Sequence, residues 1–204
     1  MIETTTGTLV AIDGVNGLAV ETAARTLARA NRKHRAAVSG WDASGIFGEL
    51  MVAEEDAGLP SARTLLLLYA ADLAFRLRWE VKPALEQGRM IVVAPYVNTA
   101  IAFGRAAGLD AKSLGEMFAF APVPDESRNI DAAASRSLSD RTGFVEFACD
   151  QLLGVTSKAV RRELLVRAAR TLKIISRVKA NKARRRSLPE AAQATTDRQN
   201  AFQD

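Results

Sequence analysis

The sequence predicts an α/β protein with a doubly wound parallel sheet, flanking helices and a basic helical segment near the C-terminus. Two observations predict the sheet. Short, wholly apolar stretches alternate with longer amphipathic ones, which is the pattern of parallel strands joined by crossover helices. The first of these strands also runs through a glycine-containing turn directly into a helix. Ligands of such folds bind beyond the carboxyl ends of the strands.

Length and composition indicate one domain with a sizeable core, because 204 residues with 48% hydrophobic content can bury one. We assign residues 1–183 to this domain and 184–204 to a polar, flexible tail. The single cysteine, Cys149, excludes an internal disulfide framework and a cysteine-rich zinc site. The N-terminus lacks a signal-peptide pattern, and the longest apolar run, from Leu65, is interrupted by Asp72. A cytoplasmic protein is therefore expected.

The first quarter of the chain predicts two strands and two helices. Residues 8–12 are apolar after Thr8 and predict a buried strand. A turn with two glycines follows, and an amphipathic pattern predicts a helix at 18–32. The short apolar stretch at 36–39 predicts the second strand. A loop with two glycines then leads to a helix at 46–56.

The middle of the chain continues this alternation. Ser61 has helix-start chemistry and precedes a helix at 62–79, which is apolar on most faces, as in a core or a subunit interface. Further helices are expected at 82–86, ended by Gly88, and at 97–107. The remaining strands are expected at 90–93 and 117–123, and the chain from Asp125 is expected to be helical with a serine-rich break near 135–139. The turns after Ile12, Ser39, Val93 and Val123 should share one edge of the sheet.

Residues 14–22 have the outline of a phosphate-binding loop without its charged groups. In the pattern G-x-x-x-x-G-K-[ST], backbone N–H groups and a Lys hold the phosphates, and Ser or Thr binds Mg²⁺. Counting from Gly14, the second Gly, the Lys and the Ser/Thr are replaced by Ala19, Val20 and Glu21. The candidate loop comprises Gly14, Val15, Asn16, Gly17, Leu18, Ala19, Val20, Glu21 and Thr22.

From about Gly7 to Val123 the chain resembles the thymidylate kinases. Five segments carry the resemblance: 13–17 resembles their E-G-x-D-G, 48–49 their G-E, 66–72 their L-L-[FY]-x-A-D, 82–88 their x-P-A-L-x-x-G, and 95–103 their D-R-Y-x-x-S-x-x-A-Y. The resemblance implies a P-loop kinase fold, ATP with Mg²⁺ as cofactors and thymidine monophosphate as substrate. It also implies a nucleotide pocket formed by Glu49, Tyr69, Asp72, Tyr96, Thr99 and Phe103, with Tyr69 stacking on the base.

The departures from this family fall on groups that would contact phosphate, metal or base. Besides Val20 and Glu21, Ala94 and Pro95 replace the Asp and Arg of D-R-Y, and Leu73 replaces the Arg after A-D. Losing one preorganised donor commonly costs about 10²–10³ in rate. We therefore expect a catalytically inactive binding or scaffolding module with weak or absent nucleotide binding, no cofactor and no metal. The alternative is a kinase that recruits cations such as Arg105, Arg128 or Arg141, and that needs ATP and Mg²⁺.

Several of these side chains have two interpretations at this stage. Glu21 either occupies the positive end of its helix or points to solvent. Tyr69 either lines a base pocket or packs in the core, and Glu49 and Asp72 either line that pocket or cap and pair locally. The single histidine, His34, complements a helix dipole, and Cys149 is expected to be a buried, inert thiol.

The C-terminal segment is strongly basic. Between residues 158 and 186 there are twelve Lys or Arg and one acid, Glu163, so a net charge of +11 here leaves −6 for the rest of a chain whose total is +5. A helix at 156–183, capped by Thr156 or Ser157, would carry one apolar stripe formed by Val160, Leu164, Ala168, Leu172, Ile175 and Val178. A strand at 172–176 is the competing interpretation. The basic surface comprises Lys158, Arg161, Arg162, Arg167, Arg170, Lys173, Arg177, Lys179 and Lys182.

Two kinds of partner follow from these patterns. The basic segment is either a solvated helix docked on the domain or a surface for an anionic partner, nucleic acid or an anionic membrane. The apolar helix around 65–75 predicts a homodimer.

Overall fold

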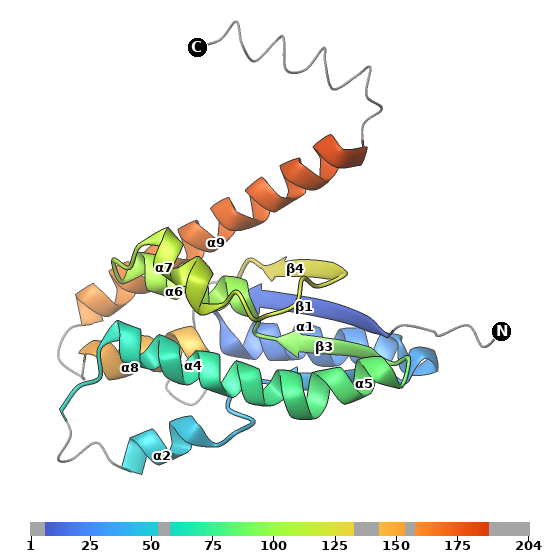
Figure 1. The fold of residues 1–204 in the computed structure, drawn as a ribbon. Coiled ribbons are helices and arrows are strands. Elements are labelled where there is room, and N and C mark those ends of the chain that lie inside the picture. Colours follow the sequence, from blue (N-terminus) through green and yellow to red (C-terminus); the bar gives the residue numbers. More distant parts are fainter. Residues whose placement is uncertain (1–6, 53–57, 133–142, 154–157, 188–204) are drawn as a thin grey trace, which may run out of the picture.

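Four parallel strands form the centre of the molecule, as the sequence predicts (Figure 1). The computed structural model describes residues 7–52, 58–132, 143–153 and 158–187. The strands lie in the order β2-β3-β1-β4, and each neighbouring pair is parallel. Their bounds are β1 Thr8–Gly14, β2 Ala37–Gly40, β3 Met90–Ala94 and β4 Glu126–Ile130.

Helices cover both faces of the sheet and return the chain to its starting edge. They are α1 Gly17–Ala30, the short η1 Arg32–His34, α2 Ile46–Val52, α4 Ala62–Arg76, the π-helical turn η2 Leu77–Val81, α5 Lys82–Glu86, α6 Val97–Ala106, α7 Ala111–Met117, α8 Phe144–Leu153 and α9 Lys158–Ser187. Helices α1, α4 and α7 begin at the side-chain caps Asn16, Ser61 and Asp110, whose oxygens accept backbone N–H groups.

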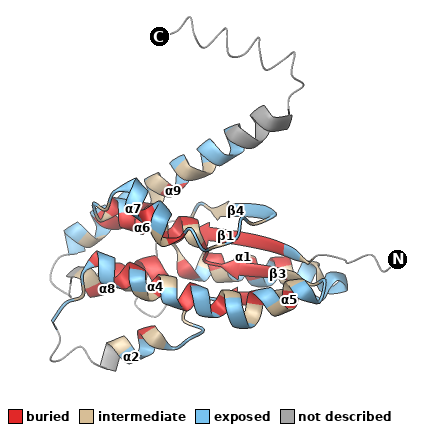
Figure 2. Cartoon of the chain, viewed as in Figure 1, coloured by how far each residue is buried: buried red, intermediate tan, exposed pale blue. Residues whose placement is uncertain are grey.

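Alternation along the strands divides the core into two parts. Leu9 and Ala11 of β1 face a large cluster with α4, α6, α8 and the first half of α9. Val10 and Ile12 face a smaller cluster with α1. Because successive strand residues point to opposite faces, one apolar strand serves both cores. Figure 2 shows the two central strands, β1 and β3, as largely buried and the edge strand β4 as mostly exposed.

The prediction of a strand at 117–123 and of a helix from Asp125 was wrong. Helix α7 ends at Met117, a turn follows, and the fourth strand is β4, which begins only at Glu126. Phe118 is buried by packing at the end of α7, not by sheet pairing. β4 is an edge strand with polar, mostly exposed residues, and edge strands carry such residues without an apolar signature.

The basic segment is a single helix, α9, and 172–176 is part of it. Leu164, Ala168 and Leu172 of the predicted apolar stripe are buried, whereas Val160 and Val178 of that stripe are exposed. The helix passes the expected end at Ala183 and reaches Ser187. Its second half extends away from the domain (Figure 1). Residues 188–204, the candidate caps Thr156 and Ser157 and the serine-rich break at 135–139 lie outside the described residues.

Candidate functional site

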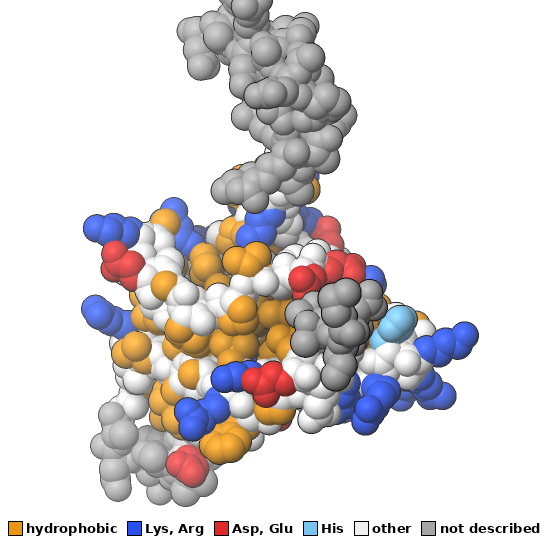
Figure 3. All heavy atoms as spheres, turned by 45° about the vertical axis from the view of Figure 1, so that its right-hand side comes forward, with side chains coloured by type: hydrophobic (Ala, Val, Ile, Leu, Met, Phe, Trp, Pro, Cys, Tyr) orange, Lys and Arg blue, Asp and Glu red, His pale blue; other side chains and the backbone are white. Residues whose placement is uncertain are grey.

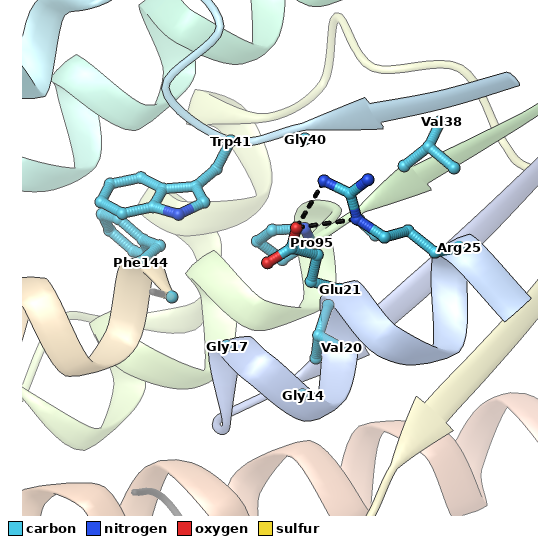
Figure 4. Close-up of a pocket in the computed structure, with 12 residues that line it drawn as sticks. Gly14, Gly17, Val20, Glu21, Arg25, Val38, Gly40, Trp41, Pro95 and Phe144 are labelled. Carbon is cyan, nitrogen blue, oxygen red and sulfur yellow. Dashed lines mark hydrogen bonds and ion pairs between the residues drawn. The ribbon is translucent and has the colours of Figure 1, made fainter. Parts of the chain in front are cut away.

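A cavity of about 390 Å³ opens where three strands end (Figure 4). It is lined by Gly14, Gly17, Val20, Glu21, Arg25, Val38, Gly40, Trp41, Ala94, Pro95, Gly143 and Phe144. The carboxyl ends of β1, β2 and β3 therefore meet at one edge, as the alternating pattern predicts. The fourth strand ends at Ile130, so the predicted turn after Val123 does not follow a strand.

Several polar groups of the candidate phosphate loop already form hydrogen bonds within the chain. The N–H of Gly14 donates to Thr99 Oγ1 at 3.1 Å. The Asn16 side chain accepts the N–H of Ala19 at 2.8 Å and so caps α1. The N–H of Gly17, the first residue of α1, donates to Glu146 Oε2 at 3.1 Å. The N-terminus of this helix, where backbone donors and the dipole favour an anion, is thus in contact with a carboxylate of the same chain.

Glu146 reaches the loop because the start of α8 packs directly on the start of α1. Glu146 is fully buried, with none of its surface exposed. Gly143 lies so close to Gly17 that a Cβ built at 143 would come within 2.5 Å of the Gly17 Cα. Only a residue without a side chain allows this approach.

The two positions that replace the Lys and the Ser/Thr of the loop pattern differ in their surroundings. Val20 is buried in the smaller core, and a Cβ at Gly14 would meet its Cγ2 at 2.5 Å. Glu21 lies one residue beyond the first turn of α1 and pairs with Arg25, Oε1 to Nη2, at 2.7 Å. Figure 4 shows this pair at the cavity, opposite Trp41 and Phe144. Glu21 is therefore neither the anion at the helix terminus nor a purely solvated side chain.

The other members of the loop have structural positions. Val15 belongs to the large core, and Ala19 is half-buried. Leu18 and Thr22 are exposed and do not line the cavity.

Asp13, at the end of β1, organises the floor beneath the loop. Its Oδ1 accepts the N–H of Tyr96 at 3.0 Å, the N–H of Thr99 at 2.9 Å and the Thr99 hydroxyl at 2.7 Å. Burial raises the pKa of this carboxyl above its usual range, and the three hydrogen bonds oppose the rise in pKa. These contacts join β1 to the start of α6.

Tyr69 packs in the core and presents no free face to the cavity. Its ring centroid lies 4.4 Å from that of Phe144, and its hydroxyl donates to the carbonyl of Tyr96 at 3.0 Å. Phe103 packs edge-on against the same Phe144 ring, at 5.5 Å. Burial raises the pKa of the Tyr69 hydroxyl, since its phenolate would lie in an apolar environment. Phe144 of α8 thus covers the tyrosine that the family resemblance assigns to base stacking.

Asp72 has a local structural role. Its two oxygens accept the N–H groups of Asp42 and Ser44 and the Ser44 hydroxyl, at 2.9–3.1 Å. Arg76 pairs with it, Nε to Oδ2, at 2.9 Å, and both side chains are fully buried. Arg76 also donates to the carbonyl of Pro95 at 3.1 Å. The pair therefore fixes the loop after β2 to the turn after β3.

The structure does not bring the expected nucleotide-pocket residues to the cavity. None of the six, Glu49, Tyr69, Asp72, Tyr96, Thr99 and Phe103, is among its lining residues. Glu49 is exposed on α2, Tyr96 and Thr99 hold Asp13, and the other three are buried as described above.

Sequence reasoning missed several residues that do line the cavity or its loop. Arg25 could have been found, because a residue four positions after Glu21 lies on the same helix face. Glu146 gave no local signal, since it is 129 positions away from Gly17 along the chain.

The cations of the basic surface divide into two groups. Arg161 pairs with Asp150, Lys173 with Asp131 at 2.8 Å, and Lys179 donates to Asn98 Oδ1 at 2.8 Å. The side chains of Lys158, Arg162, Arg167, Arg170 and Arg177 are exposed. The Lys182 side chain lies outside the described residues. Basic side chains therefore both attach α9 to the domain and remain on its surface.

The cations named for the alternative kinase do not reach the cavity where the structure describes them. Arg105 is in the last turn of α6, away from its cavity end, and Arg128 pairs with Glu126 at 2.6 Å on the exposed edge strand. Arg141 lies outside the described residues.

The remaining titratable candidates have no role at the cavity. His34 is exposed in η1, and Cys149 is buried in α8, where burial raises the pKa of its thiol to about 12. Within the described ranges, no three His, Cys, Asp or Glu side chains gather as a metal site, and none of the helices is long and apolar enough to cross a membrane.

Comparison with known proteins connects this fold to one family, although no protein-family model matches the chain. A probable thymidylate kinase of Pyrococcus abyssi is 27% identical over 168 residues, which cover 74% of this chain and 78% of that protein. A thymidylate kinase of Clavibacter michiganensis is 31% identical over 126 residues, covering 53% and 60%. The crystal structure of thymidylate kinase from Ehrlichia chaffeensis superposes with a TM-score of 0.58 at 14% identity, covering 86% of this chain and 89% of that one. The chain is therefore similar in sequence to several thymidylate kinases and shares their fold.

Proposed function

We propose that this thymidylate-kinase-like protein does not transfer phosphoryl groups and acts as a cytoplasmic binding or scaffolding module. The observation that carries the proposal is the contact between Gly17 and Glu146, with the N–H 3.1 Å from the carboxylate oxygen. A phosphate would need the donor that this buried carboxylate already holds. A second anion there would also meet a like charge in a desolvated place, which is unfavourable.

The residues of this site do not fit a magnesium nucleotide. Val20 offers no cation at the position of the loop Lys, and Glu21, at the position of the metal-binding hydroxyl, is paired with Arg25. Phosphoryl transfer depends on positioning and on neutralising the charge of the phosphoryl oxygens. Arg25 is the cation among the described residues that lines the cavity, and it forms an exposed ion pair with Glu21. These features support a protein that uses its fold without the chemistry of its relatives.

A calorimetric titration tests this proposal directly. The wild-type chain is titrated with ATP–Mg²⁺, ADP and thymidine monophosphate, and turnover is followed in a coupled assay. We expect no turnover and weak or absent binding. Clear binding followed by turnover would contradict the proposal and favour the kinase alternative.

Substitution of Glu146 tests whether its contact with the Gly17 N–H excludes phosphate. Glu146→Gln keeps the shape of the side chain and removes its charge, so ADP and inorganic phosphate should bind the variant more tightly than the wild type. Glu49→Gln is the matched control, because Glu49 is exposed on α2 and does not line the cavity. Equal affinities in the three proteins would show that Glu146 does not exclude phosphate.

The scaffolding part of the proposal rests on an apolar surface. Leu67 and Phe75 of α4 and Trp79 of η2 follow one another at intervals of one or two helical turns and are 52%, 39% and 61% exposed. Leu66, Tyr69 and Leu73 of the same helix are buried in their own core, so they cannot form an interface. Figure 3 shows hydrophobic side chains gathered on one face among charged ones.

We propose that a second copy of the chain covers Leu67, Phe75 and Trp79. Trp79→Asp and Phe75→Asp should then convert a dimer into a monomer in sedimentation velocity, because a charge in such an interface has no partner. Leu18→Asp, at an exposed apolar position of α1, is the control and should leave the mass unchanged. A wild-type monomer at high concentration would contradict this part.

A further inference from the structure

Helix α9 has a docked half and a projecting half. In the docked half, Leu164, Leu165, Ala168 and Leu172 are buried against the domain. From Arg177 to Asn181 every residue is exposed, although the Lys179 amine still reaches Asn98. Figure 1 shows the second half of the helix extending beyond the sheet and its covering helices. The described part of the projecting half, residues 177–181, is therefore accessible around most of its circumference.

After its first turns, α9 carries charged residues of one sign only. After Glu163 the helix contains nine Lys or Arg and neither Asp nor Glu as far as Ser187. Arg167, Arg170 and Arg177 lie on its exposed side, and none of them forms an ion pair with any acid that the structure describes. Their separations of three and seven residues keep them close to one line along the helix. The result is a row of uncompensated guanidinium groups on a helix that leaves the domain.

We propose that α9 binds double-stranded DNA through its backbone phosphates, with the exposed side of the helix, which carries Arg167, Arg170 and Arg177, facing the major groove. The charge of the partner must be negative and repeated along its length, which a phosphate backbone supplies. An α-helix with its side chains is about 10–12 Å across, and the major groove of B-DNA is about 12 Å wide. Arginines along the helix would then lie near phosphates that border the groove. This inference is independent of the proposed function of the cavity.

The composition of α9 argues against a membrane surface. An interfacial helix presents a broad apolar face that carries residues such as Trp, Phe or Leu. The broad apolar face of α9 is the one buried against the domain. The large apolar residues exposed on α9 are Val160, Val166, Ile174 and Val178, and none of them is aromatic. Arg170 and Arg177 lie next to Ile174 and Val178.

Single strands and double-stranded RNA fit less well than duplex DNA. α9 contains no Phe, Trp or Tyr, and non-specific single-strand binding depends on aromatic rings that stack on bases. The major groove of A-form RNA is deep and too narrow for a helix.

Fluorescence anisotropy with the full chain and a labelled DNA duplex at several salt concentrations tests this proposal. Affinity should fall linearly with salt on a log–log scale, with a slope near −0.9 per neutralised phosphate. The variant R167Q/R170Q/R177Q should bind at least about tenfold more weakly and lose about 2–3 units of slope. All three side chains are exposed, so the variant should fold, which circular dichroism checks.

The matched control removes the same charge from another surface. Arg29, Arg32 and Lys33 are exposed at the end of α1 and in η1, so R29Q/R32Q/K33Q has the same net charge as the first variant. It should keep the wild-type affinity. Equal weakening by both variants would overturn the proposal in favour of a general charge effect. Absence of wild-type binding at low salt, or tighter binding to phosphatidylserine vesicles, to single strands or to duplex RNA, would overturn it too.

Discussion

Gly143 and Gly17 are in direct backbone contact, and this contact brings α8 onto the candidate phosphate loop. A Cβ at position 143 would lie 2.5 Å from the Gly17 Cα and 2.9 Å from its nitrogen. Both atoms belong to backbone, which cannot move aside as a flexible side chain would. The contact also sets the position of Glu146, three residues into the same segment, whose carboxylate holds the Gly17 N–H.

Gly143→Ala should therefore destabilise the protein. The added methyl group has to push α8 away from α1, and overpacking of this kind costs about 1–3 kcal/mol. Urea unfolding followed by circular dichroism measures the change. Gly115→Ala is the control, because a Cβ there meets nothing within 4 Å. In helix α7 the control should be neutral or stabilised by up to about 1 kcal/mol. Equal stabilities of the Gly143 variant and the wild type would contradict the tight contact.

The buried pair of Asp72 and Arg76 should contribute strongly to cooperative folding. Removing one partner leaves the other charge buried without compensation, which costs about 3–5 kcal/mol. Arg76→Met and Asp72→Asn should each lower the free energy of unfolding by an amount in this range. The exposed pair of Lys82 and Glu86, at 3.8 Å, is the control, and Glu86→Gln should change stability by less than about 0.5 kcal/mol. Similar small losses in both pairs would contradict a structural role for Asp72.

The thiol of Cys149 should be unreactive in the native protein. The residue is fully buried, and burial raises its pKa to about 12, so both access and ionisation are suppressed. Ellman's reagent at mildly alkaline pH should label it only as fast as the chain unfolds. Labelling of one thiol per chain in urea is the control. Rapid labelling in native buffer would show that α8 leaves its place readily.

The sequence predicted those parts of the fold whose signal is local. β1 and β3 are apolar on both faces, and α1 and α6 have helical periodicity, so their positions followed from pattern alone. β4 was missed because an edge strand of polar residues carries no such pattern. Residues 172–176 lie inside α9, which packs against α6, whereas the sequence alone left a strand and a helix open for them.

The site was less predictable than the fold for the same reason. Positions in the loop, such as Val20 and Glu21, could be compared with a known pattern. Glu146, which accepts the Gly17 N–H, and Phe144, which lines the cavity, both come from α8. This helix is distant from the loop in sequence, and no local pattern links the two segments. The roles of Asp72 and Tyr69 depended on which surface their helix buries, and a helix that is apolar on most faces does not reveal this.

The stability of the protein should depend on pH through Asp13. Burial raises the pKa of this carboxyl above the usual 3.8, so the folded state favours the protonated acid more than the unfolded chain does. The stabilisation that comes from protonating Asp13 is complete below the pKa of this carboxyl in the unfolded chain. It is lost as pH rises through the pKa of the same carboxyl in the folded protein. Asp13→Asn carries no such charge, so its stability relative to the wild type should improve as pH rises from about 3 to about 7. Urea unfolding of both proteins across this range measures the difference.

Asp110 should show the opposite dependence of stability on pH, because its pKa is lowered. It caps α7 from an exposed position, and hydrogen bonds from Ser113 and Lys112 lower its pKa. Its contribution is therefore present above pH 3.8 and lost as pH falls through the lowered pKa, so Asp110→Asn should lose stability relative to the wild type as pH rises. If Asp13→Asn follows the same direction as Asp110→Asn, the three hydrogen bonds at Asp13 outweigh its burial, and the floor of the loop is built around an ionised carboxylate.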